Sequence, residues 1–131
     1  RWGGEEFLVV AKGTDRAQGA IQAERILSMI RNKPFDIGGG ETIRKTCSLG
    51  FAPYPCVEDN PEAVTWQQVV DLADRCLYSA KKSGRDGWVG IRDCKSEPVT
   101  VGAFLEAPLT VIGERGWDLA TSFPEIAKLE W

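Results

Sequence analysis

The sequence lacks histidine altogether and has only four cysteines among its 131 residues. The cysteines are widely and irregularly spaced, and no Cys-x-x-Cys pair occurs. Zinc sites built from cysteine and histidine are therefore not expected, nor are triads that use a histidine base. We expect reduced, mostly buried thiols, as in a cytosolic protein, at Cys47, Cys56, Cys76 and Cys94.

An excess of positive charge and long apolar runs are also missing. The 16 Lys and Arg residues face 19 Asp and Glu residues, and the net charge of −3 argues against a binder of nucleic-acid polymers. No apolar run approaches the roughly 20 residues that span a bilayer, and the N-terminus has no signal-peptide pattern. We expect a soluble, cytoplasmic piece, even if further sequence tethers the parent protein to a membrane.

The apolar residues, 43% of the chain, are sufficient for a core without disulfides or a structural metal. Phe7 to Ala11 is a short run of strand formers and predicts a buried strand. Helical spacing of apolar residues follows, from a cap at Thr14 or Asp15 to a stop near Asn32, before Pro34. The three glycines within residues 35–43 predict a loop or hairpin, and residues 44–52 predict a second strand.

The clearest predicted element is a helix over residues 66–80, where apolar residues recur at i, i+3, i+4 and i+7. Gly84 is a natural stop for it, and residues 87–91 predict a third strand. Prolines then interrupt the chain and no long periodicity survives. We place a boundary near residues 92–98, with one unit at 1–91 and a C-terminal extension at 92–131. In the extension we expect short strands at 99–105 and 109–112 and a short helix at 123–129.

The opening residues Gly3-Gly4-Glu5-Glu6-Phe7 combine a turn with two carboxylates. Gly-Gly permits a two-residue hairpin and lets backbone N–H groups approach a ligand closely. Two carboxylates beside such a turn suit a hard divalent cation such as Mg²⁺. In a regular strand they would point to opposite faces, so both reach one metal only if the turn is irregular. The alternative is a plain turn with two solvated glutamates.

A second candidate group lies about 75 residues further on. Lys81 is in the last turn of the predicted helix, and Arg85 follows the Gly84 stop. Two cations in that position suit a phosphate ligand. The alternative is that they only interact with the negative end of the helix dipole.

Four segments together resemble the GGDEF domains of bacterial diguanylate cyclases. They are RWGGEEF at residues 1–7, AERI at 23–26, TCSLGFA at 46–52 and ADRCLYSAKKSGRDGW at 73–88, in the order and spacing of that family. The resemblance implies an α+β fold. It would be part of a ferredoxin-like, nucleotidyl-cyclase-like sheet with two helices, followed by the extension.

The resemblance also implies an enzyme that condenses two GTP molecules into cyclic di-GMP, with Mg²⁺ or Mn²⁺ as cofactor and two domains facing each other in a homodimer. By the same resemblance Glu5 and Glu6 are catalytic and metal-binding, with Glu5 ranked first as metal ligand and base. Gly3 and Gly4 would pack against the nucleotide, and Lys81 and Arg85 would contact the triphosphate. Arg25 would hold cyclic di-GMP at an allosteric site. The alternative is that Arg25 is a solvated arginine on a helix face.

Two departures from the family qualify this interpretation. Asp86 stands where the family usually has asparagine. The family's domain begins well before its signature, with a strand that carries another metal-binding aspartate. We therefore expect a truncated domain that is inactive in isolation. Its strand at residues 7–11 would be completed by an upstream segment, a second copy or the extension.

Two further functions stay open at this stage. One is a non-catalytic module that binds GTP or cyclic di-GMP. The other is a dimerisation domain whose extension provides aromatic anchors at Trp117, Phe123 and Trp131.

Overall fold

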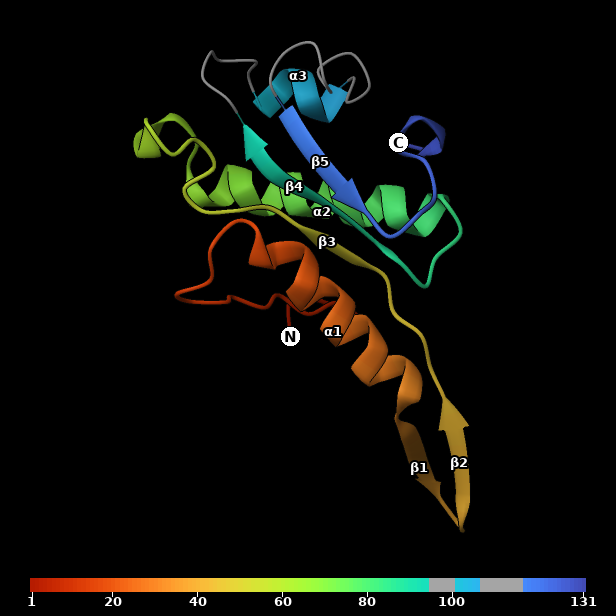
Figure 1. Ribbon diagram of the computed structural model, residues 1–131. Coiled ribbons are helices and arrows are strands. Elements are labelled where there is room, and N and C mark those ends of the chain that lie inside the picture. Colours follow the sequence, from red (N-terminus) through yellow and green to blue (C-terminus); the bar gives the residue numbers. More distant parts are fainter. Residues whose placement is uncertain (95–100, 107–116) are drawn as a thin grey trace.

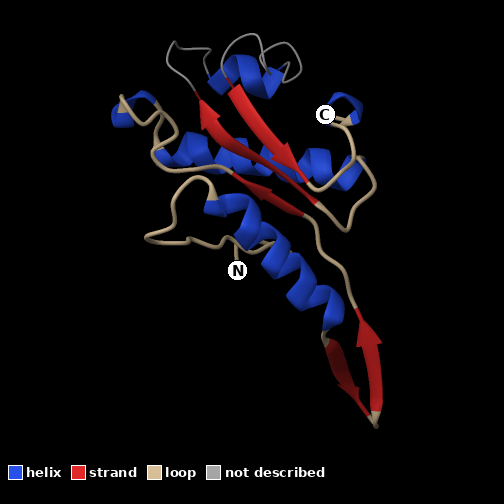
Figure 2. Cartoon of the chain, viewed as in Figure 1, coloured by secondary structure: helices blue, strands red, loops and turns tan. Residues whose placement is uncertain are grey.

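The computed structural model describes residues 1–94, 101–106 and 117–131, and within them the chain folds into three helices and two small sheets (Figures 1 and 2). This is the α+β class that the sequence predicts. The helices are α1 (Gln18–Asn32), α2 (Trp66–Lys82) and α3 (Val101–Glu106). The strands are β1 (Pro34–Gly38), β2 (Glu41–Arg44), β3 (Leu49–Phe51), β4 (Trp88–Cys94) and β5 (Trp117–Thr121).

The larger sheet has the order β3-β4-β5. β3 and β4 are parallel, so α2 between them serves as the crossover that parallel strands require. β5 comes from the C-terminal extension and pairs antiparallel with β4, with Leu119 opposite Ile91. The extension thus contributes a strand to the same sheet as the segments before it.

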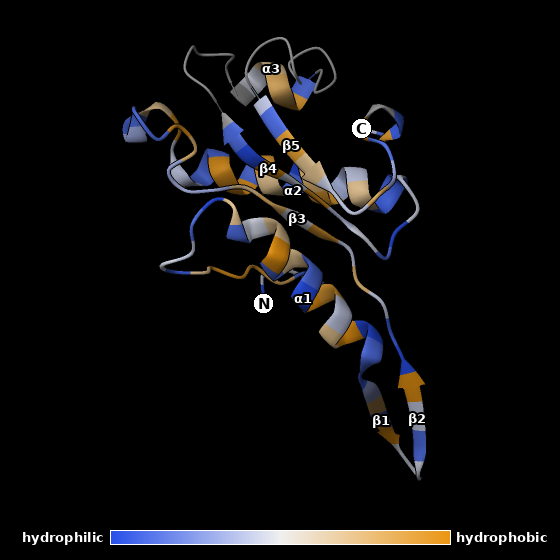
Figure 3. Cartoon of the chain, in the orientation of Figure 1, coloured by the Kyte–Doolittle hydropathy of each residue, from blue (hydrophilic) through white to orange (hydrophobic). Residues whose placement is uncertain are grey.

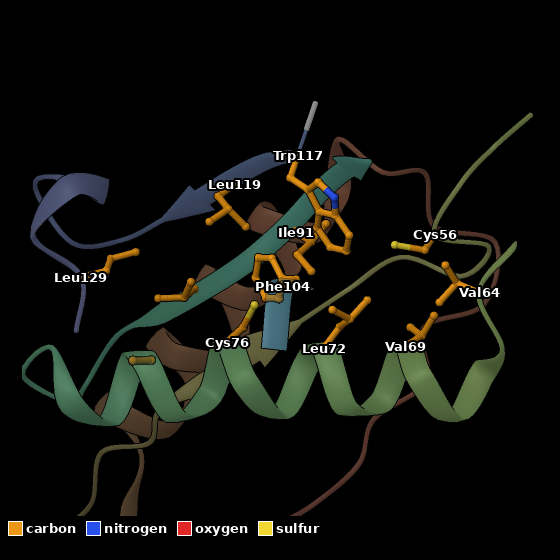
Figure 4. Packing of buried hydrophobic residues seen from close by; sticks show 12 residues of the cluster. Cys56, Val64, Val69, Leu72, Cys76, Ile91, Phe104, Trp117, Leu119 and Leu129 are labelled. Atoms are coloured by element: carbon orange, nitrogen blue, oxygen red, sulfur yellow. The ribbon is translucent and has the colours of Figure 1, made fainter. Parts of the chain in front are cut away.

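Alternate residues of β4 face the two long helices. Val89 and Ile91 belong to a buried cluster with α2, and Figure 4 shows Ile91 pointing toward the α2 side chains. Trp88, which directly precedes Val89 in β4, packs with Ala23 and Leu27 of α1. Since successive side chains of a strand point to opposite sides, α1 and α2 cover opposite faces of the sheet.

Local signals set the bounds of both long helices. Thr65 caps α2: its hydroxyl accepts from the Gln68 amide at 3.3 Å, and the Gln68 side chain accepts from the Thr65 amide at 2.9 Å. The N-cap of α1 is Ala17 rather than the expected Thr14 or Asp15, and it makes no side-chain cap bond, although the Asp15 carboxylate accepts from the Gln18 amide at 2.9 Å just before the helix. α1 ends at Asn32, before an extended Lys33, so the predicted stop is confirmed.

The predicted hairpin is also confirmed. β1 and β2 pair antiparallel through the glycine turn and project away from the larger sheet beyond the end of α1 (Figure 1). The strand predicted at residues 44–52 is shorter than expected. Its first residue belongs to β2, and β3 spans only Leu49–Phe51, where the backbone of α2 approaches Gly50 so closely that a Cβ would overlap it.

The prediction of a buried strand at residues 7–11 is wrong. These residues form no strand, and the side chains of Phe7, Val9 and Val10 are 72%, 69% and 73% exposed. They appear as a continuous apolar stretch near the N-terminus in Figure 3. A strand forms only with a partner for its backbone N–H and C=O groups, and no described residue pairs with this segment.

The extension differs from its sequence prediction as well. Residues 101–106 form a helix rather than a strand, because Phe104 is fully buried and stacks on Trp117 at 4.7 Å between ring centroids. β5 was not predicted, and the expected helix at 123–129 is a single 3₁₀ turn at Ile126–Lys128. The strand expected at 109–112 lies outside the described residues.

The three aromatic residues proposed as dimer anchors are used within the chain. Trp117 is 4% exposed, and Phe123 and Trp131 pack against the same buried cluster. They are therefore not available as exposed anchors for a partner. Among the described residues, no helix has the length and apolar character needed to cross a membrane.

Candidate functional site

The opening residues form a tight turn. The Glu6 amide donates to the Gly3 carbonyl at 2.7 Å, and the Trp2 amide donates to the Glu6 carbonyl at 2.9 Å. Gly4 has a φ of 50°, which glycine adopts without the steric cost of a side chain. The Arg1 side chain donates to the Gly4 carbonyl at 2.7 Å across the turn. The turn predicted from Gly-Gly is present, with Gly4 and Glu5 at its centre between the bridged residues Gly3 and Glu6.

An ion pair brings the opening turn to the end of α2. Lys81 Nζ lies 2.7 Å from Glu6 Oε1, and the two side chains are 37% and 38% exposed. The contact joins the two groups of candidate residues that lie 75 residues apart in the sequence. Glu6 therefore has a cation as its neighbour, which leaves Glu5 as the available carboxylate of the turn.

Glu5 is exposed and makes no hydrogen bond or ion pair with any described residue. Nowhere in the described ranges do three or more Asp, Glu, Cys or His residues lie close enough together to hold a metal ion. Of the described residues, Glu5 alone would therefore offer a metal at this turn an unpaired carboxylate, beside waters and substrate phosphates. Mg²⁺ accepts such a set, since it usually keeps several waters beside one or two carboxylates.

The turn between α2 and β4 holds Arg85 in an unusual conformation. Arg85 and Asp86 have φ values of 59° and 47°, in the left-handed region that side chains disfavour. The Arg85 amide donates to the Ala80 carbonyl at 3.0 Å and closes the end of the helix. The Arg85 guanidinium is exposed and pairs with no described carboxylate, so it is available to an anion.

Arg31 of α1 fixes the next residue of that turn. Its guanidinium lies 3.0 Å from the Asp86 carboxylate and also donates to the Asp86 carbonyl at 3.1 Å. Sequence reasoning missed this contact, because Arg31 and Asp86 lie 55 positions apart in the chain. The one indication of this contact in the sequence was Asp86 itself, an acidic residue where the GGDEF domains that the sequence resembles usually have asparagine.

Arg25 and Cys47 complete the description of the candidate region. Arg25 is exposed on α1 and has no ion-pair partner among the described residues, so the structure does not join it to the opening turn. Cys47 is half-buried. Burial raises the pKa of its thiol, the Asp86 carboxylate raises it further, and Arg31 opposes both effects. This thiol therefore stays protonated to higher pH than a free cysteine.

Comparison with known proteins gives a consistent result. The family model described as "Diguanylate cyclase, GGDEF domain" matches residues 1–87. The response regulator PleD of Caulobacter vibrioides is 37% identical over 91 residues, 69% of this chain and 19% of PleD. Diguanylate cyclase A of Treponema denticola is 33% identical over 86 residues, 66% of this chain and 22% of that protein. Diguanylate cyclase DgcP of Pseudomonas aeruginosa is 37% identical over 86 residues, 66% of this chain and 12% of DgcP.

The chain spans less than a quarter of the length of these curated relatives. No solved structure matches it significantly. The matched residues 1–87 contain the opening turn, Lys81 and Arg85, and they end just before β4 and the extension.

Proposed function

This chain belongs to the GGDEF family, and we propose that its full-length protein condenses two GTP molecules into cyclic di-GMP and two pyrophosphates. The observation that supports this most strongly is the contact between Glu6 and Lys81, because it places the glycine turn and its free carboxylate beside the cationic end of α2. GTP is a cytoplasmic substrate, so the proposal also locates the domain in the cytoplasm.

In the proposed reaction the 3′-oxygen of each GTP attacks the α-phosphorus of the other, so two such attacks close the ring and release two pyrophosphates. The new P–O bond forms as the bond to the pyrophosphate leaving group breaks, and each domain of a homodimer holds one nucleotide. A divalent metal, Mg²⁺ or Mn²⁺, would neutralise phosphate charge and lower the pKa of the attacking hydroxyl. Glu5 is proposed as its ligand and as the acceptor of the hydroxyl proton, since its carboxylate is exposed beside the turn.

The other side chains are proposed to bind and orient the nucleotide. Gly3 and Gly4 have open space where a Cβ would lie, so the nucleotide can approach their backbone. Lys81 places positive charge next to the turn, and the exposed Arg85 guanidinium is proposed to add a second charge where negative charge shifts onto the leaving pyrophosphate. Glu6 orients the Lys81 ammonium toward the turn through their ion pair.

The proposal is tested by incubating the full-length protein with GTP and Mg²⁺ and measuring cyclic di-GMP and pyrophosphate. Glu5→Gln should abolish the product and leave the melting temperature unchanged, because the side chain is exposed and has no described partner. Glu41→Gln, on the distant β1–β2 hairpin, is the matched control and should retain turnover. Full activity in Glu5→Gln would remove Glu5 from the mechanism, and GTP binding without turnover in the unsubstituted protein would indicate a sensor module.

Arg25 is proposed to contact cyclic di-GMP at a separate inhibitory site. Its exposed side chain has no described ion-pair partner, which leaves it available for a phosphate. In the full-length protein, Arg25→Ala should then lessen inhibition by added cyclic di-GMP while the initial rate stays the same. Unchanged inhibition would assign Arg25 to the solvated face of α1.

A further inference from the structure

Two consecutive non-glycine residues with positive φ, Arg85 and Asp86, make the α2–β4 turn a strained segment. Such a conformation persists only where the surrounding structure fixes it. One contact comes from within the turn, where the Arg85 amide donates to the Ala80 carbonyl, and one comes from α1, through Arg31. A third comes from β3, where the Leu49 amide donates to the Gly87 carbonyl at 3.0 Å. The C-terminal extension adds further contacts, and they meet the turn at both of its ends.

Phe123 contacts the C-terminal end of the turn. A Cβ placed on Gly87 would lie 2.6 Å from Cζ of Phe123 and 2.8 Å from Oγ of Ser122, so the ring and the hydroxyl fill the space beside this glycine. The same ring lies next to Gly84, at 3.7 Å from the corresponding position. Phe123 therefore lies against both glycines that flank Arg85 and Asp86, although Gly84 remains exposed.

Hydrogen bonds hold this part of the extension in place. Ser122 Oγ accepts from the Trp88 amide at 2.9 Å, and the Ser122 amide donates to the Trp88 carbonyl at 3.1 Å. The Phe123 amide donates to the Thr121 hydroxyl at 3.1 Å. The ring is thus fixed relative to the first residue of β4, immediately after the turn.

The N-terminal end of the turn has its own contact with the extension. The Glu130 amide donates to Ser83 Oγ at 2.9 Å, so the residue that ends α2 is tied to the C-terminal segment of the chain. Ser83 and Gly87 bracket the strained residues, and each of them touches the extension. The family match covers neither Phe123 nor Glu130, since it ends at residue 87.

We propose that the extension positions the α2–β4 turn for phosphate binding, with Phe123 as the positioning residue for Arg85. Phe123 does not touch the nucleotide. Its ring holds Gly84 and Gly87 in place, and with them the left-handed Arg85 that directs the free guanidinium toward the phosphates. This role rests on the phosphate contact proposed for Arg85 above.

The test uses the full-length protein with Mg²⁺ and GTP, and compares Phe123→Ala with Leu119→Val. Leu119 is buried in the same extension but faces the α2 cluster rather than the turn, so it controls for a general loss of stability. We expect Phe123→Ala to raise the KM for GTP about tenfold, a loss of about 1.4 kcal/mol, with little change in kcat. Ser83→Ala should move KM in the same direction, and Leu119→Val should not.

A double-mutant cycle shows whether Phe123 acts through Arg85. In an Arg85→Ala background, Phe123→Ala should have almost no further effect on KM, because the group that it positions is gone. An undiminished effect in that background would overturn the positioning role. If Arg85→Ala lowers the affinity for GTP and Phe123→Ala does not, the positioning role is overturned and the proposed function stays intact. If Arg85→Ala leaves the affinity for GTP unchanged, the phosphate contact of Arg85 itself is overturned.

Hydrogen exchange provides a readout that does not depend on turnover. The Arg85 amide is bonded to the Ala80 carbonyl, so its exchange rate reports whether the turn is closed. Phe123→Ala should speed exchange at this amide by about tenfold or more, and Leu119→Val should leave it nearly unchanged. Equal protection in Phe123→Ala and the unsubstituted protein would show that the extension does not hold the turn.

Discussion

Lys81 Nζ and Glu6 Oε1 lie 2.7 Å apart and join the opening turn to the C-terminal end of α2. Among the described residues, this is the one ion pair that connects residues 1–6 to a helix. Both side chains remain more than one third exposed, so water screens the pair and its contribution to stability is small. Its importance lies in geometry, because it sets where the carboxylates of the turn lie relative to the cations of α2.

The first prediction concerns which residue of this pair carries the positive charge. Lys81→Met in the full-length protein should lower cyclic di-GMP formation at least about tenfold, since a preorganised cation is lost, and should cost less than about 1 kcal/mol of stability. The exchange Glu6→Lys with Lys81→Glu should restore the stability but not the activity. Turnover and urea denaturation measure the two effects.

Lys82→Met is the control for that prediction, because Lys82 is the next residue of α2 and lies near the Tyr78 ring rather than the turn. It should leave the activity unchanged. Full recovery of turnover in the exchanged double variant would show that the pair acts only as a structural tie, and that the lysine ammonium itself has no role toward the nucleotide.

The second prediction concerns the left-handed residue Asp86. Asp86→Asn should retain most of the stability, because asparagine tolerates a positive φ and its side-chain oxygen still accepts from Arg31. Asp86→Ala loses the carboxylate that pairs with Arg31, keeps the bond to the backbone carbonyl and retains the strained φ of 47°, so it should cost about 1–3 kcal/mol. Asp86→Gly separates the two causes, since glycine relieves the backbone strain but does not restore the ion pair with Arg31.

Thermal denaturation of the three Asp86 variants gives the comparison directly. The expected order of stability places Asn above Gly and Gly above Ala. An Ala variant as stable as the Gly variant would mean that the backbone of the turn relaxes freely, and that neither Arg31 nor the extension constrains it.

Patterns local in sequence predicted most of the fold. The spacing of apolar residues gave α2 within two residues of its C-terminal bound, and the effect of Pro34 gave the end of α1. The glycine turn and the cationic end of α2 were predicted as separate candidate groups. Their contact through Glu6 and Lys81 depends on tertiary structure, so no spacing along the chain indicated it.

The errors arose where tertiary partners decide the structure. Phe7 to Val10 have strand-forming side chains, but without a paired strand their backbone groups remain in solvent. Phe104 lies in a segment of β-branched and aromatic residues, which favour a strand. The segment is nevertheless a helix, because the helix brings the Phe104 ring onto Trp117. β5 was missed because its stability comes from pairing with β4, which is distant in sequence.

The third prediction is a loss of stability at high pH through Cys76. This thiol is fully buried, and burial raises its pKa above the ordinary value of 9.0, with Arg75 opposing the effect slightly. The folded state therefore holds the proton more tightly than the unfolded state. The resulting stability is fully present below about pH 9 and is lost as the pH rises above that value, by about 1.4 kcal/mol per pH unit.

Urea denaturation from about pH 7 to about pH 10.5 measures this dependence. Cys76→Ala should lower the stability at neutral pH and flatten the decline above pH 9. Ser79→Ala is the matched control, since Ser79 is a buried neighbour on the same helix without a group that titrates in this range. An equally steep decline in Cys76→Ala would assign the effect to other groups.

The fourth prediction concerns the apolar segment at residues 7–10. Phe7, Val9 and Val10 are all more than two thirds exposed, and β5 pairs with β4 rather than with this segment. An exposed apolar stretch with unpaired backbone groups is prone to self-association. A chain of residues 1–131 alone should therefore form larger species as its concentration rises, measured by sedimentation velocity.

Val9→Lys with Val10→Lys should suppress that association by adding charge to the stretch without disturbing a buried side chain. The control is Ile37→Lys, at an apolar residue that is 55% exposed on the separate β1–β2 hairpin, and it should associate as the unsubstituted chain does. A monomeric 131-residue chain over the whole concentration range would contradict the prediction. It would mean that residues 7–10 stay exposed to solvent without driving self-association.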